Sequence, residues 1–150
     1  MLRLSTGLRT SLAGTTGLAA ALANGVIEIR TGTQPASADS ATSGTLLGTV
    51  TLASGPFTPG SATNGLTFAA ASGGSVSKTG TWSFVGVAQG TAGWFRFKAN
   101  GVDDGGTSTS LPRLDGSIST SGADMSLSNI NISVGAPTTI DMFTVTIPAR

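Results

Sequence analysis

The sequence predicts an all-β protein: a single-domain antiparallel β-sandwich with a short helical N-terminal arm. From residue 26 onward, apolar and polar residues alternate in short runs, as they do in half-buried strands. Turn-forming residues separate these runs at intervals of about 8–12 residues, which is typical of sandwiches. The first 25 residues instead carry leucines at helical spacing. We therefore expect an arm over residues 1–25 and a β-domain over residues 26–150.

The arm is predicted to form two short helices. Its leucines recur every four residues in two groups, Leu4, Leu8 and Leu12, then Leu18 and Leu22. The pair Asn24-Gly25 is expected to end the second helix, with the glycine in the left-handed conformation. Helices shorter than about 12 residues need packing to stay folded. The leucines therefore either cover one end of the sandwich or dock onto a neighbouring subunit, and we expect docking.

Strands are predicted wherever the alternation is clear. The runs lie at 27–29, 46–52, 66–68, 82–84, 94–98, 125–134 and 143–147. The alternation slips by one residue at Ser128-Asn129, which predicts a β-bulge or a bend between sheets. A jelly roll and an immunoglobulin-like sandwich share this pattern, so both topologies stay open.

The clearest strand, at 94–98, has an unusual polar face. Phe95 and Phe97 point to one side, and Trp94, Arg96 and Lys98 to the other. Proteins that bind single-stranded nucleic acids use such faces, but with many more cations than this chain has. Tryptophan and arginine are enriched at subunit contacts. Trp94 is expected to pack under a loop or at such a contact. Our predicted subunit interface comprises Leu4, Leu8, Leu12, Trp94 and Arg96.

The composition excludes several classes of function. The chain has no histidine, cysteine or tyrosine. Zinc sites and Ser–His or Cys–His catalysis need residues that are missing. A net charge of +1 creates no field that would attract nucleic acid or an anionic membrane. No apolar stretch approaches the ~20 residues of a membrane span. We expect no cofactor, no metal, no nucleic acid and no membrane partner.

The seven acidic residues do not form a recognisable catalytic or metal-binding motif. The spacing of a calcium loop is absent. We expect Asp103 and Asp104 to lie in a turn, Asp115 and Asp124 before a glycine or at loop ends, and Glu28 on an outward strand face. A pair of carboxylates for glycoside hydrolysis is disfavoured by this distribution. Phosphate-binding glycine motifs and a Ser–Lys arrangement are also absent. The sequence predicts no enzyme.

Several stretches resemble small virion proteins of tailed bacteriophages. They include LANGVIEIR at 22–30 and GTAGWFRF at 90–97, together with 33–39, 44–52, 114–118 and 125–132. The resemblance implies a structural role in the virion and names no catalytic residues. Weak charge fits a subunit crowded on a lattice, because it limits repulsion between copies.

Our main hypothesis is a capsid decoration (cement) protein on the capsid exterior, made in the host cytoplasm. It would bind the major capsid protein and copies of itself. The alternative is a tail, tail-tip or fibre component. The loops at 32–43 and 100–110 would then contact other tail proteins or the host surface.

Overall fold

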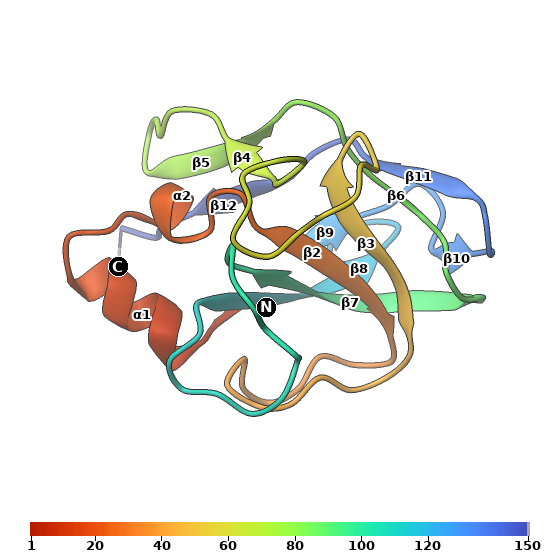
Figure 1. Cartoon of the computed structure of the whole chain (residues 1–150), viewed down its shortest axis with the longest axis horizontal. Helices are drawn as coiled ribbons and strands as arrows, with labels where there is room; N and C mark the ends of the chain where they lie inside the picture. Colours follow the sequence, from red (N-terminus) through yellow and green to blue (C-terminus); the bar gives the residue numbers. More distant parts are fainter. Residues whose placement is uncertain (150) are drawn as a thin grey trace.

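The computed structural model describes residues 1–149 and confirms the predicted all-β class. Two short helices, α1 (Thr6–Ala13) and α2 (Leu18–Ala21), lie together at one end of the molecule (Figure 1). The strands are β1 (Arg3–Leu4), β2 (Val26–Thr31), β3 (Leu46–Leu52), β4 (Thr67–Phe68), β5 (Ser75–Thr79), β6 (Trp82–Val85), β7 (Gly90–Lys98), β8 (Arg113–Ser119), β9 (Met125–Ser126), β10 (Asn131–Ile132), β11 (Pro137–Ile140) and β12 (Thr144–Thr146).

The strands form one large and one small sheet. The large sheet has nine strands in the order β1-β8-β7-β2-β3-β6-β11, with β10 added to β7 and β9 added to β8. All of its pairs are antiparallel except β8 with β9. The small sheet has the order β12-β5-β4. In Figure 1 the small sheet lies above the helical end of the large one. Two sheets around one core form the predicted sandwich.

Aromatic rings from both sheets meet in the core. The ring of Phe97 in β7 stacks on that of Phe68 in β4, with centroids 5.6 Å apart. Phe143, just before β12, lies 5.5 Å from Trp82 of β6 and 5.6 Å from Phe95. Aromatic pairs at these separations contribute about 0.5–1.5 kcal/mol each beyond the area that they bury. These contacts hold the small sheet against the large one.

The N-terminal arm is packed onto the sandwich. Leu8 and Leu22 are fully buried in the same core as the strands, and β1 pairs with β8. The helix stop differs in detail from the prediction, because Asn24 takes the left-handed conformation (φ 58°). Gly25 is needed for another reason: a Cβ there would lie 2.0 Å from the carbonyl oxygen of Lys98. The alternative that the leucines cover one end of the sandwich is thus observed for Leu8.

The predicted strands are present, and the structure has four further strands, β1, β5, β8 and β11. The alternation missed β8 although Leu114 and Ile118 lie on one side of it and Arg113 and Asp115 on the other. The slip at Ser128-Asn129 is a bend within the large sheet and not between sheets, because β9 before it pairs with β8 and β10 after it pairs with β7. The chain therefore crosses between two strands of the large sheet at this point.

Candidate interaction surface

The sheet face opposite the core carries a layer of buried charge. Arg96 of β7 donates from Nε and Nη2 to the two carboxylate oxygens of Asp115 in β8, each at 2.8 Å. Both side chains are fully buried. The guanidinium also lies 5.6 Å from the ring centroid of Trp94, on the same face. The two residues meet because β7 and β8 pair in a register that places Arg96 opposite Asp115.

A second and a third pair extend this layer along the strands. Arg113 donates to both carboxylate oxygens of Asp103, at 2.7 and 2.6 Å. Lys98 pairs with Glu28 of β2 and also donates to the backbone oxygen of Asp103 at 2.9 Å. No buried side-chain nitrogen or oxygen in residues 1–149 lacks a hydrogen-bond partner. The layer is therefore internally satisfied, as buried charges must be.

Loops of the same chain cover the charged layer. Arg96 donates to the carbonyl oxygen of Ser40 at 3.0 Å. Trp94 donates from Nε1 to the carbonyl of Thr31 at 3.2 Å. Arg3 donates to the carbonyls of Gln34 and Pro35. The bonds from Arg96 and Arg3 tie the loop at 32–43 to the sheet, whereas Thr31 is the last residue of β2.

This cover corrects part of the predicted subunit interface. Trp94, Arg96 and Leu8 are fully buried within the chain. Burial of Trp94 within the chain excludes the subunit contact, which was one of the two alternatives for it. The alternating pattern identified the correct face of β7, but it could not indicate that 32–43 folds back over that face. Leu4 and Leu12 remain half-buried and are the two predicted interface residues still open to a partner.

The pKa values of the carboxyl groups are set by burial and by their hydrogen-bond partners. Burial alone would raise the pKa of Asp103, but hydrogen bonds from Arg113 and the Gly105 amide, with nearby positive charges, hold it below its ordinary value. The hydrogen bond from the Thr6 hydroxyl is the main cause of the lowered pKa of Asp39. Burial raises the pKa of Asp115, and the two hydrogen bonds from Arg96 oppose this without reversing it.

The acidic residues agree with the prediction in part. Asp103 and Asp104 do form a turn, in which their side chains accept from the amides of Gly105 and Gly106. Asp124 ends the loop before β9 and accepts from the amide and hydroxyl of Ser117. Asp115 precedes a glycine as expected, but inside β8 and not at a loop end. Glu28 is largely buried between Lys98 and Arg30 and does not face solvent.

The sequence pattern did not predict the Arg113–Asp103 pair. The alternation of charged and apolar residues at 113–118 could have indicated a strand with a charged face that includes Arg113.

Internal pairing leaves a surface with little charge. Among the described residues, only three ionisable side chains are well exposed to solvent, those of Arg9, Asp104 and Asp141. The rest of the exposed surface is dominated by glycine, serine, threonine and alanine. Covering such a surface with a partner costs little free energy, because few charged groups lose their hydration.

An apolar cleft lies between the arm and β12. Its volume is about 510 Å³, and its walls include Leu4, Leu12, Leu114, Val145 and Ile147. Cavities of about 300–1,000 Å³ with mostly apolar walls are typical of binding sites. The cleft brings the two half-buried leucines of the predicted interface together with the last strand.

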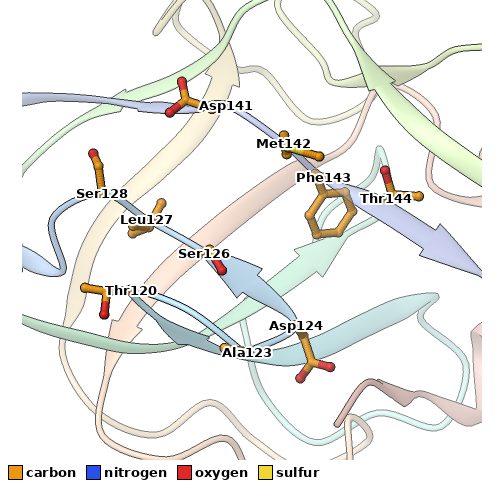
Figure 2. Close-up of a pocket in the computed structure, with 10 residues that line it drawn as sticks. All are labelled: Thr120, Ala123, Asp124, Ser126, Leu127, Ser128, Asp141, Met142, Phe143 and Thr144. Atoms are coloured by element: carbon orange, nitrogen blue, oxygen red, sulfur yellow. The ribbon is translucent and has the colours of Figure 1, made fainter.

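A second cavity continues along β12 from the first. It has a volume of about 380 Å³. Figure 2 shows its two walls, residues 141–144 along one side and residues 124–128 along the other. Asp124 lines both cavities. The two cavities together form what we call the β12 cleft, which runs past Asp141, Thr144 and Ile147.

The described residues hold no cluster of three or more carboxylates, histidines or cysteines arranged around a metal position. No helix within residues 1–149 has the length and apolar character required to cross a membrane. Comparison of the chain with protein-family models, with curated proteins and with solved structures gives no match.

Proposed function

We propose that this chain is a non-enzymatic structural protein of a phage virion, and that it decorates and stabilises the capsid lattice. The virion assignment rests on the sequence resemblance described above. The observation that carries the binding role is the β12 cleft, an open apolar site on a surface with few exposed charges. On a repeating lattice, weak contacts of this kind act together and give strong attachment.

The internal charge layer supports the same role. A decoration protein must keep its shape while it braces other subunits. The pairs Arg96–Asp115 and Arg113–Asp103 tie strands and loops together beneath the surface. The partner in this proposal is the major capsid protein, with neighbouring copies of the chain.

Quantitative mass spectrometry of purified virions tests the proposal. The copy number of this chain is measured relative to the major capsid protein. A ratio near one, or one copy per few capsid subunits, is the expected result. A few copies per particle would favour the tail alternative, and absence of the chain would overturn the virion role.

Binding to shells that lack the protein tests the cleft itself. Ile147 lines the cleft and is 51% exposed, so Ile147→Ser removes apolar surface without opening the core. Val102 is 80% exposed and lies away from the β12 cleft, so Val102→Ser is the matched control. We expect co-sedimentation with shells to weaken for Ile147→Ser only. Equal binding by both variants would remove the cleft from the proposal.

A further inference from the structure

The outer edge of β12 has no strand beside it. β12 is the terminal strand of the small sheet. Its pairing with β5 uses the peptide groups of Phe143 and Ile147, seen in the bonds Lys78 N to Phe143 O and Ile147 N to Gly74 O. In an antiparallel strand, the N–H and C=O of one residue point to one side and those of the next residue to the other. The N–H and C=O groups of Thr144 and Thr146 therefore point away from β5, into the β12 cleft.

The opposite wall of the cleft is also a strand edge. The amide of Leu127 donates to Ser119 of β8 at 3.0 Å. β9 pairs with β8 in parallel, and the N–H and C=O groups of successive residues alternate in direction in a parallel strand as well. Those of Ser126, the residue before Leu127, therefore point away from β8. Ser126 lines the cavity that Thr144 lines from the other side (Figure 2). An edge of the large sheet and an edge of the small sheet thus flank one gap.

We propose that the β12 cleft accepts an extended segment of a partner protein, which pairs with β12 as an added β-strand. Binding by strand addition uses main-chain hydrogen bonds for affinity and pockets for alternate side chains. The occupant is a segment of the major capsid protein, an identity that rests on the proposed function, whereas the mode of binding is argued from the strand edges and cavities.

The chemistry of the walls specifies the segment. Inward side chains of the segment would meet Leu127 and Phe143, which favours apolar residues at every second position. The described residues that line the two cavities include Asp124 and Asp141 but no lysine or arginine. Asp124 is already paired at 2.7 Å with the N-terminal ammonium of Met1, which also lines the cleft, so the uncompensated charge is that of Asp141. Asp141 is exposed and makes no ion pair with the described residues. The segment should therefore be neutral or basic, with a lysine or arginine near Asp141.

Two exposed apolar side chains mark the same place. Met142 is 78% exposed, and Ile147 is half exposed at the other end of β12. β12 is only three residues long, but an uncharged open edge with apolar flanks still invites pairing with other chains. No charged side chain lies on β12 itself, where Thr144, Val145 and Thr146 follow each other. Covering of this edge by a strand of the bound partner would explain why the edge carries no protecting charge.

A synthetic peptide tests strand addition without any assumption about the virion. The probe is the acetylated peptide Lys-Thr-Val-Ser-Val-Thr-Lys, and its control carries N-methyl groups on alternate amides, which removes donors from one edge. We expect the probe to shift the amide resonances of Thr144, Thr146 and Ser126, and to slow exchange of the first two by roughly tenfold or more. Equal effects from the N-methylated peptide, or shifts elsewhere, would overturn the proposal.

A proline variant tests the same edge from the protein side. Thr144→Pro removes an N–H that points into the cleft and leaves the β5 ladder intact. Thr144→Val is the matched control, because both changes lose the hydroxyl contact with Ser77 and only proline loses the N–H. We expect the proline variant alone to lose the peptide. If it does not fold, the N-methylated peptide still decides the question.

The remaining outcomes separate this inference from the proposed function. Full incorporation of Thr144→Pro into particles would overturn strand addition and leave the decoration role standing. Absence of the wild-type chain from particles would overturn the decoration role, and the peptide result would still judge the cleft. Protection of Thr144 and Thr146 that rises with protein concentration alone would show that a second copy occupies the edge, against our proposal.

Discussion

Removing either member of the buried Arg96–Asp115 pair should destabilise the protein, but with different dependence on pH. Asp115→Leu leaves a guanidinium that keeps only the carbonyl of Ser40 as acceptor. Arginine cannot lose its proton in a protein. Arg96→Met leaves a carboxyl group that can become neutral by taking up a proton. The two variants therefore remove one interaction in two different ways.

The magnitudes follow from burial and from proton uptake. Breaking a fully buried pair costs about 3–5 kcal/mol, a large part of a typical domain's stability. In Arg96→Met the cost is limited by protonation of Asp115, whose ordinary pKa is 3.8. At about 1.36 kcal/mol per pH unit, that protonation costs about 4.4 kcal/mol at pH 7 and about 1.6 kcal/mol at pH 5. The folded variant then holds one more proton than the unfolded chain, so its stability rises as the pH falls.

Urea unfolding at pH 7 and pH 5 measures this difference. Relative to the wild type, Arg96→Met should recover about 2–3 kcal/mol between the two pH values, and Asp115→Leu should recover almost nothing. The double variant Arg96→Met/Asp115→Leu should be far less destabilised than either single one, because neither charge of the pair is left buried without its partner. Parallel pH dependence of the two single variants, or a cost below about 1 kcal/mol for Asp115→Leu, would refute this reasoning.

Three further predictions concern particular side chains. The buried hydroxyl of Ser5 accepts from two backbone amides and donates to a carbonyl, so Ser5→Ala should cost about 2–3 kcal/mol in urea unfolding, whereas Ser11→Ala should cost little. Gly48→Ala places a Cβ 2.2 Å from the ring of the core phenylalanine in β6 and should cost about 1–3 kcal/mol. Gly101→Ala, with open space around it, is its control in the same thermal-melting experiment. Because the pKa of Asp103 is lowered in the fold, the stability advantage of the wild type over Asp103→Asn should be complete well above pH 3.8 and shrink as the pH falls below it. A constant advantage across that range would contradict the assigned ion pair.

The sequence predicted the local features well, because they depend on neighbouring residues. The alternation in 94–98 identified which residues of β7 share a face. The spacing of leucines identified both helices, although Leu4 itself lies in β1 and pairs with Leu114 of β8. The turn at Asp103-Asp104 was also predicted, since its hydrogen bonds span only two residues.

The candidate site was predicted only in part. Leu4 and Leu12 do line the β12 cleft, but Trp94 and Arg96 are fully buried within the chain, and Arg96 bonds to Ser40 of the loop at 32–43. Polar residues alternating with apolar ones normally mark a solvent-facing side of a strand. In this chain a loop covers that side, and no periodicity within β7 records the position of a loop more than 50 residues earlier.

The sequence by itself determined the class of fold, the weak net charge and the absence of several catalytic chemistries, because each follows from composition or from spacing along the chain. The tertiary structure decided where the charges lie and which edges stay open. Arg96 meets Asp115 through the register between β7 and β8, and the β12 cleft exists because two sheets end beside each other without pairing. Both depend on contacts between residues far apart in the chain, which local pattern does not encode.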